Sequence, residues 1–416
     1  MKPRGEVEPR RSPAAEVELL LDLGRALHQY GTPAHRLESA VSDVAAALGL
    51  RAGVFSTPTA LFATFSASTS AGGPRETHLE RLAPSEVDLG KLGDVDGLAQ
   101  RLIGGELGVE EARRALAEIV ARPPRYGPVS TALAAAVLSA SFAAILRAGW
   151  PAIALSGGCG LVLGTLSVLL AQASALRRLQ ELLGALVVSA LAASLAPRLG
   201  ATPQVVTLAG VILLVPGLTI TRAFSELAQG SLVSGTSRLF GAVLSFLMLG
   251  FGVLLGGRLV ASLLEAPPSP LPAPSTLPVW TVYAAVIAAG LAFTILLGAA
   301  RRDLPWIVVA GLATFWISAE SSAAWGPEVA AFIAALAAGV GSNAYARLAR
   351  RPALIPRVPA LLLLVPGSLG YRSVSSLLVQ DALTGVQHAF SVAMLVVALV
   401  AGLLAAGAIF PVRGHL

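Results

Sequence analysis

Apolar and polar positions divide this 416-residue chain into two parts. Up to about residue 127, apolar residues recur at short intervals among charged ones. From residue 128 onward, apolar runs of about 20 residues alternate with short polar breaks, a pattern typical of membrane-spanning helices. Ten apolar segments can be distinguished, although the third, fourth, eighth and ninth have poorly marked ends. They cover residues 128–147, 151–172, 182–197, 202–220, 239–262, 278–298, 304–320, 327–346, 353–370 and 389–410.

The first part predicts a small α+β domain. Helical spacing runs from Glu16 to Tyr30, where Gly31 ends the helix. Thr32-Pro33 is a suitable N-cap and first-turn pair for a second helix to about Leu48. β-branched and aromatic residues from Val54 to Phe65 predict a strand pair or one kinked strand. A looser stretch follows, and helical spacing returns at residues 94–102 and 109–121.

Composition marks the boundaries between these parts. Residues 1–14 are rich in Pro, Arg and Glu, which predicts disorder. Pro123-Pro124 ends the N-terminal domain, and an uncharged Pro-rich stretch, 266–274, divides the apolar region. The predicted organisation is a disordered N-terminus (1–14), an α+β domain (15–124), a first five-helix repeat (125–265), a linker (266–277) and a second five-helix repeat (278–416).

The two halves of the apolar region carry the same motif. Leu214-Val215-Pro216-Gly217 is followed by Arg222, and Leu364-Val365-Pro366-Gly367 is followed by Arg372, 150 positions later. A shared offset across more than about 100 residues indicates an internal duplication. Further identities at this offset are Pro128 with Pro278, Ser225 with Ser375, Gly235 with Gly385, and Phe240 with Phe390.

Five spans per half imply a definite topology. After an odd number of spans the chain is on the opposite side of the membrane. The second repeat therefore enters the membrane from that side, and the two repeats should be inverted. With the N-terminal domain in the cytoplasm, inside loops carry 11 arginines and outside loops carry 4. This positive-inside bias fits ten spans with both termini cytoplasmic. The fold expected is a mainly α integral membrane protein with ten transmembrane helices in two inverted five-helix repeats, preceded by a small cytoplasmic α+β domain.

Charge and composition exclude several classes of function. Residues 128–416 hold 15 arginines and 7 acids, so the excess basic charge belongs to membrane loops rather than to a nucleic-acid-binding face. The single Cys159 excludes an intrachain disulfide and a cysteine metal cluster. The polar N-terminus predicts no cleavable signal peptide. The sequence has no nucleotide-binding loop, zinc-protease motif or nucleophile elbow, so uphill transport would be ion-coupled and no cofactor is expected.

The repeated Pro-Gly step is the leading candidate for a substrate site. Proline removes a helical hydrogen bond, and in hydrocarbon the freed carbonyls need a partner or a water-lined cavity. Matching breaks in two inverted halves indicate a central transport site, whereas a simple kink or helix end is the alternative. Guanidinium groups past each break could bind a carboxylate or reach lipid headgroups. The candidate substrate-binding residues are Pro216, Gly217, Thr219, Arg222, Asn343, Pro366, Gly367, Ser368, Tyr371 and Arg372.

Three acids are candidates for proton coupling: Glu226, Asp381 and Glu320. Glu226 and Asp381 lie in weakly amphipathic stretches, for which an interfacial helix with solvated charge is the favoured interpretation. Glu320 is expected on a loop rim at the end of the seventh span. For the Asn343 amide, packing against a neighbouring helix is favoured over substrate contact.

Two further groups have plain structural interpretations. Small residues around Cys159, in Ser156-Gly157-Gly158-Cys159-Gly160, indicate close helix packing and an inert buried thiol. In the N-terminal domain a His/acid cluster could be hydrolytic or metal-binding, but its spacing fits a solvated helix face better. That cluster consists of Asp22, His28, His35, Arg36, Glu38 and Asp43.

Over nearly its whole length the chain resembles the threonine/serine exporter family. The resemblance rests on the residues 21–27 and 31–38, on Ser56-Thr57-Pro58-Thr59-Ala60, and on both Val-Pro-Gly motifs with Ser234-Gly235 and Tyr371-Arg372. It implies a ten-span inner-membrane protein that exports L-threonine and L-serine, driven by the proton motive force, with a hydrolase-like or regulatory N-terminal domain. Some members carry the two halves on separate chains, in agreement with the linker at 266–274.

The sequence therefore predicts a secondary transporter for small neutral amino acids in the plasma membrane, not an enzyme. Its partners would be the amino-acid substrate and membrane lipids, without nucleic acid, and a homo-oligomer is compatible with the sequence. Two alternatives stay open. The chain could be a membrane-anchored hydrolase with its chemistry in residues 15–122, or a membrane sensor with an N-terminal interaction module. Exact substrate, coupling ion and stoichiometry are not encoded in the motifs.

Overall fold

A computed structural model describes residues 14–67, 76–83, 86–171, 176, 179–263, 277–364 and 382–411. The backbone separates into two compact units, an N-terminal unit that ends at Pro123 and a larger unit that begins at Pro124 and also takes up Asp88–Gly90. Each unit is described by itself. The Pro-rich linker and the second Val-Pro-Gly motif fall outside the described residues.

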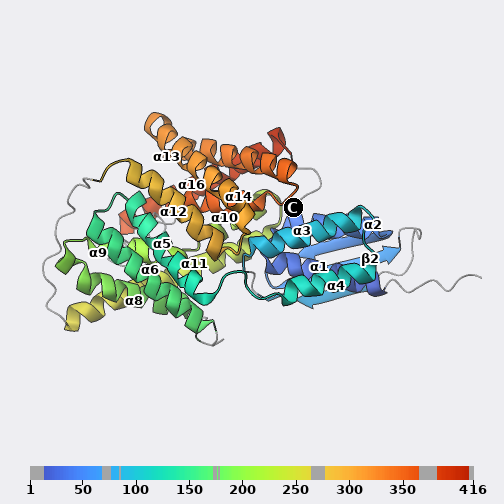
Figure 1. The fold of residues 1–416 in the computed structure, drawn as a ribbon, viewed down its shortest axis with the longest axis horizontal. Helices are drawn as coiled ribbons and strands as arrows, with labels where there is room; N and C mark the ends of the chain where they lie inside the picture. Colours follow the sequence, from blue (N-terminus) through green and yellow to red (C-terminus); the bar gives the residue numbers. More distant parts are fainter. Residues whose placement is uncertain are drawn as a thin grey trace, which may run out of the picture. The chain divides into compact units, whose positions relative to one another are not determined.

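Helices and a sheet make up the N-terminal unit (Figure 1). The helices predicted from Glu16 and Val109 are confirmed. Gly31, with a φ of 93°, follows the first helix, and this left-handed backbone is readily adopted only by glycine. The predicted Thr32 cap is wrong. Pro33 occupies the N-cap position, and the buried Thr32 hydroxyl has no hydrogen-bond partner among the described residues. The helices are α1 (Ala14–Gln29), α2 (Ala34–Ala47), α3 (Leu89–Ile103) and α4 (Val109–Ala121).

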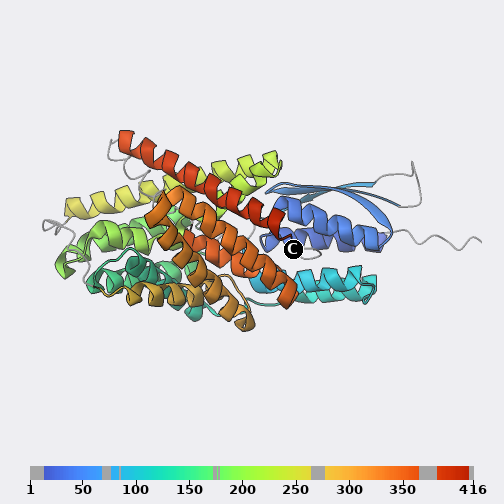
Figure 2. The same cartoon turned by 90° about the horizontal axis from the view of Figure 1, so that it is seen from above.

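The sheet has three antiparallel strands in the order β1-β2-β3. They are β1 (Leu50–Ser56), β2 (Ala60–Ala67) and β3 (Glu76–Arg81), so a strand pair rather than one kinked strand spans Val54–Phe65. β3 was not predicted, because its sequence, ETHLER, has a single large apolar residue. Leu61, Ala63 and Phe65 are buried on one face of β2, and Figure 2 shows the strands, in blue, on one side of the unit's helices.

The second unit is built from helices that overlap the predicted apolar segments, although the segment 202–220 is divided among several elements. Its first half contains α5 (Pro128–Ile145), α6 (Trp150–Leu170), α8 (Gln180–Leu195), α9 (Pro203–Gly210), α10 (Gly217–Ala228) and α11 (Leu232–Leu263). Its second half contains α12 (Trp280–Leu296), α13 (Leu304–Ala349), α14 (Leu354–Leu364) and α16 (Ala382–Ile409). Short 3₁₀ turns η1 (Pro197–Leu199), η2 (Ile212–Leu214) and η3 (Arg301–Asp303) complete the described elements.

Not every predicted segment is long enough to cross a membrane as a single helix. Among the described residues, five helices are sufficiently long and apolar: α5, α6, α11, α16 and a helix of Arg301–Ala349 that includes η3 and α13. The pair formed by α9 and Ile212–Ala228 would be a sixth span, bent by 46°. The apolar helices α8, α12 and α14 are shorter. The chain is thus mostly helical and has the composition of a membrane protein, whereas the number of ten spans stays a prediction.

α13 is interrupted near its middle. Gly326 has non-helical angles (φ 82°, ψ 168°) and precedes Pro327, so two helical legs meet there. The two predicted segments 304–320 and 327–346 correspond to these legs. Glu320 lies six residues before the break, exposed and inside the first leg, rather than on a loop rim.

Glycines set the close packing of helices in both halves. A Cβ atom on Gly252 of α11 would lie 2.4 Å from the Leu182 carbonyl oxygen of α8. At the 150-residue offset, a Cβ atom on Gly402 of α16 would lie 2.4 Å from the Phe332 carbonyl oxygen of α13. The same helix-to-helix contact therefore recurs in both halves, between equivalent residues.

The small-residue packing predicted for the second apolar segment is confirmed. A Cβ atom on Gly160 of α6 would lie 2.6 Å from the Ala135 carbonyl oxygen of α5, and Gly157 faces Ala140. These two helices pack along their length (Figure 1). Cys159 is buried beside this contact, as expected of a thiol in a packed core.

Candidate functional site

The first Val-Pro-Gly motif breaks a helix. α9 ends at Gly210, the turn η2 follows, and Val215 adopts an extended conformation (φ −67°, ψ 121°). Pro216, with a ψ of 39°, is the N-cap residue of α10, which begins at Gly217. The segment Ile212–Ala228, which contains the motif, is bent by 46° relative to α9. The motif is therefore an interruption between two helices, not the plain end of one.

The break leaves backbone polar groups available. Gly217 N–H donates to the Val215 carbonyl oxygen at 2.8 Å, and Pro216 has no N–H to donate. The Thr221 hydroxyl donates to the Gly217 carbonyl oxygen at 3.1 Å. Among the described backbone hydrogen bonds, none ends on the carbonyl oxygens of Leu213 or Leu214. The first N–H groups of α10 also lack intrahelical partners, as at the start of any helix.

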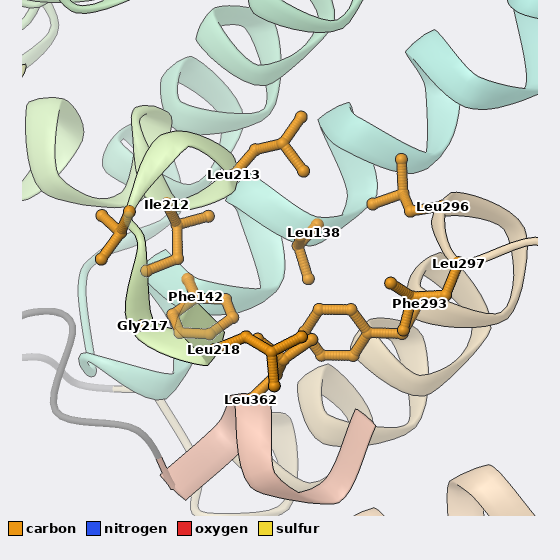
Figure 3. A pocket seen from close by; sticks show the side chains of 11 residues that line it. Leu138, Phe142, Ile212, Leu213, Gly217, Leu218, Phe293, Leu296, Leu297 and Leu362 are labelled. Carbon is orange, nitrogen blue, oxygen red and sulfur yellow. The ribbon is translucent and has the colours of Figure 1, made fainter. Parts of the chain in front are cut away.

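A cavity of about 240 Å³ lies beside the break. Figure 3 shows side chains from α5, η2, α10, α12 and α14 around a common space. Ile212 and Leu362 line it from the two halves of the chain and are 150 positions apart, the offset of the repeat. The cavity is thus shared by both halves. Its lining consists of Leu138, Phe142, Ile212, Leu213, Val215, Gly217, Leu218, Phe293, Leu296, Leu297 and Leu362.

A buried cluster of charges follows on α10 and α11. Nε of Arg238 donates to both carboxylate oxygens of Glu226, at 3.0 and 3.2 Å. The Glu226 side chain is 0% exposed, so the predicted solvated charge is wrong for this residue. Arg222 lies one helical turn before Glu226, on the same face of α10, and interacts electrostatically with both Glu226 and Arg238. Two cations and one anion therefore share a partly buried region.

A tight turn holds this cluster together. Gly230, with a φ of 82°, reverses the chain between α10 and α11, and Ser231 N–H donates to the Glu226 carbonyl oxygen at 2.9 Å. A Cβ atom on Gly235 would lie 2.8 Å from the Ala223 carbonyl oxygen, so the two helices approach closely. Glu226 and Arg238, which are 12 positions apart in sequence, can pair because the turn brings α10 and α11 side by side.

Asn343 has protein partners for both ends of its amide. Its Nδ2 donates to the Phe410 carbonyl oxygen at 2.7 Å, and its Oδ1 accepts from the Arg357 guanidinium. The side chain is buried and ties α13 to α14 and to the end of α16. These contacts match the packing interpretation, and a substrate at this amide would have to compete with them.

The structure brings together only part of the predicted site. Gly217 lines the cavity, and Pro216 adjoins it at the start of α10. Thr219 and Arg222 are further along α10 and do not line the cavity, nor does Asn343. The remaining candidates lie outside the described residues: Pro366, Gly367, Ser368, Tyr371, Arg372 and Asp381.

Several residues of this region were missed by sequence reasoning. Arg238 and Arg357 are ordinary loop arginines in the sequence, but each binds a candidate residue. Tyr345 donates to Oδ1 of Asp303 at 2.9 Å, and Arg351 lies 3.4 Å from Oδ2 of the same carboxylate. This network joins the two ends of α13. Its only sequence signal is an acid next to an apolar segment.

The N-terminal cluster is not a solvated helix face. His28 is buried, the pKa of Arg36 is lowered by burial, and Glu38 accepts a hydrogen bond from the Ser56 backbone N–H at 2.8 Å. Only Asp43 of the six residues is fully at the surface, with Asp22 in a half-exposed ion pair to Arg25. Among the described residues, no group of three or more His, Cys, Asp or Glu side chains could hold a metal ion.

Comparisons with known proteins find relatives among membrane proteins. The chain is similar to pheromone-regulated membrane protein 10 of Saccharomyces cerevisiae strain YJM789, with 29% identity over 367 residues, 86% of this chain and 47% of that protein. The S288c protein of that name is 30% identical over 300 residues, 70% of this chain and 77% of the relative. The Candida albicans strain WO-1 protein of that name is 27% identical over 88% of this chain and 34% of its own length.

This chain thus spans about half the length of the first of these relatives and about a third of the Candida protein. No solved structure gave a significant match. The family model of the threonine/serine exporters matches residues 18–260, and a second model of that exporter family matches 281–409. These two matches include the N-terminal unit, the broken helix and both halves of the apolar region, and the chain is therefore a member of the threonine/serine exporter family.

Proposed function

We propose that this chain is a secondary transporter that exports small neutral amino acids, threonine and serine, across the plasma membrane. The observation that carries the proposal is the cavity beside the helix break, lined by equivalent residues of both halves. Interrupted helices that meet at the interface of two repeats are the usual construction of a transporter's central site. Its volume of about 240 Å³ is below the 300–1,000 Å³ of pockets for drug-sized ligands, which suits a small solute.

The halves are inverted in this proposal. Five spans per half require opposite orientations, and the arginine count favours both termini in the cytoplasm. The recurrent contact of Gly252 with Leu182 and of Gly402 with Phe332 supports the duplication. α8, α12 and α14, the bent α9–α10 pair and the two legs of α13 would then complete ten spans.

The break supplies the polar groups that an apolar cavity lacks. The substrate carboxylate lies toward the start of α10, where free N–H groups and the helix dipole favour an anion, with Arg222 one turn beyond. The hydroxyl of threonine or serine donates to the carbonyl oxygens of Leu213 or Leu214. Glu226 lies on the same helix as Gly217 and Arg222, and in this proposal the proton motive force drives export through it.

Counterflow of labelled amino acids into proteoliposomes tests the proposal. Vesicles with purified protein and unlabelled threonine inside should accumulate labelled threonine and serine, and an imposed pH gradient should change the rate. Arg222→Gln should raise the half-saturating threonine concentration, whereas Arg258→Gln, on an exposed face of α11, should not. Folded protein that gives no accumulation would refute transport of these substrates.

A further inference from the structure

The sheet of the N-terminal unit has one covered face and one open face. Strand side chains alternate, and Leu61, Ala63 and Phe65 are buried against the unit's helices. The opposite set of side chains is called the outer face here. Its members are Arg51, Gly53 and Phe55 of β1, Ala60, Phe62, Thr64 and Ser66 of β2, and Thr77, Leu79 and Arg81 of β3.

Three large apolar side chains form a row across this outer face. Phe55 is opposite Phe62 in the β1–β2 register, and Phe62 is opposite Leu79 in the β2–β3 register. Their exposed fractions are 47%, 41% and 65%, and the two phenyl rings are 6.2 Å apart. Apolar groups in a contiguous exposed row, unlike scattered single ones, indicate a surface that binds something.

The charges on the outer face have one sign. Arg51 and Arg81 flank the row and are exposed, and no member of the outer face is acidic. The acids of β3, Glu76 and Glu80, alternate onto the opposite side, where Glu80 pairs with Arg25. This basic and aromatic face belongs to a region with more acids than bases, since residues 1–127 carry 17 acids and 15 bases.

The chain tethers the N-terminal unit to an apolar helix that can cross a membrane. Six residues separate the end of α4 at Ala121 from the start of α5 at Pro128, and α5 is long and apolar enough to cross a bilayer. Six extended residues reach about 20 Å, so the unit is held at high effective concentration beside the lipid surface.

We propose that the outer face docks on the membrane surface and binds anionic phospholipid headgroups. Phe55, Phe62 and Leu79 enter the boundary between headgroups and acyl chains, and Arg51 and Arg81 contact phosphate groups. Two copies of this chain paired through the same face would oppose four arginines without an acid between them, so charge complementarity favours an anionic lipid surface over a second copy.

Lipid contact can be measured on the full chain in nanodiscs. Replacing the buried Cys159 by alanine leaves a background for single labels. A fluorophore at Thr77→Cys reports the outer face, and one at Glu118→Cys on the exposed side of α4 is the control. The nanodisc lipids are brominated, because bromine quenches only nearby probes. They contain phosphatidylcholine with or without the anionic phosphatidylglycerol.

We expect the probe at position 77 to be quenched at least about twofold more with phosphatidylglycerol than without it, and less at high salt. The probe at 118 should be unaffected. Arg51→Glu with Arg81→Glu should remove the lipid dependence, whereas Arg114→Glu, an exposed site on α4, should keep it. Leu79→Ser, at the most exposed apolar position of the row, should weaken quenching without unfolding the protein.

Equal quenching at 77 and 118, or quenching at 77 that ignores phosphatidylglycerol and salt, would overturn the proposal. So would energy transfer between labelled copies at position 77 in place of lipid quenching, which would identify a second copy on this face. The thermal unfolding midpoint of each variant distinguishes a lost contact from a misfolded unit. None of these readouts depends on amino-acid transport.

Discussion

Single residues on α10 show how the first half carries charge within an apolar region. Glu226 is fully buried and paired with Arg238, and Arg222 on the same helix interacts electrostatically with both charges. A buried guanidinium is stable only if an opposite charge or water compensates it. Because Arg222 and Arg238 share the single Glu226 carboxylate, the cluster has an excess positive charge, which the proposed substrate carboxylate would balance.

Breaking the buried pair should therefore destabilise the protein. Glu226→Gln leaves Arg238 and Arg222 without their common acid and should cost about 3–5 kcal/mol of the free energy of unfolding. In the double variant Glu226→Gln with Arg238→Gln, part of this loss should be recovered, since the Arg238 charge is no longer left unpaired. Thermal unfolding in detergent measures the loss of stability in the single and in the double variant. Strictly additive losses would show that the pair has no special energetic role.

At the scale of helices, Gly and Pro decide where the elements approach and where they break. Gly252 and Gly402 have no room for a Cβ atom against the facing helix, and Pro216 and Gly326-Pro327 interrupt helices. Apolar runs and these breakers predicted the positions of most described apolar helices and the break at Pro216, but not that α10 continues to Ala228. They could not predict β3, which is mostly polar, or the absence of a Thr32 cap, which depends on local backbone geometry.

Alanine at the two equivalent glycines should have the same effect. Gly252→Ala and Gly402→Ala each force apart helices that meet at a backbone carbonyl and should cost roughly 1–3 kcal/mol. Gly241→Ala on α11 and Gly407→Ala on α16 are controls, because a Cβ atom there meets nothing within 4 Å. These controls should be neutral or slightly stabilising, as alanine favours helix over glycine. If the unfolding midpoints of Gly252→Ala and Gly402→Ala equal those of the two controls, these glycines are not needed for close helix packing.

Restoring the helix at the break should impair transport more than folding. Pro216→Ala returns an N–H group and removes the ring that obstructs the preceding turn, so α9 and α10 can straighten. Threonine counterflow should fall while the unfolding midpoint is kept or raised. Pro203→Ala is the matched control, since a proline in the first turn of α9 breaks no hydrogen bond. Equal transport by both variants would remove the break from the mechanism.

At the scale of the whole molecule, the candidate site is formed jointly by the two halves of the internal repeat. The cavity is lined by Ile212 and Leu362, which are equivalent by the 150-residue offset, so a single half could not form it. The sequence predicted the offset and the helix break from the repeated motif. It could not predict the cavity's Leu and Phe lining, or the pairing of Glu226 with Arg238 and of Asn343 with Arg357. Those contacts join helices whose mutual packing has no signature in the local sequence.

The most direct measurement is threonine counterflow with the cavity filled. Leu362→Trp places a larger side chain in the space shared by both halves, and Leu244→Trp, 55% exposed on α11, adds the same bulk away from it. Both variants should reconstitute as folded protein. If the cavity beside the Val-Pro-Gly break is the transport site, Leu362→Trp reduces counterflow to the level of empty vesicles and Leu244→Trp keeps it. Undiminished counterflow by folded Leu362→Trp would contradict the account.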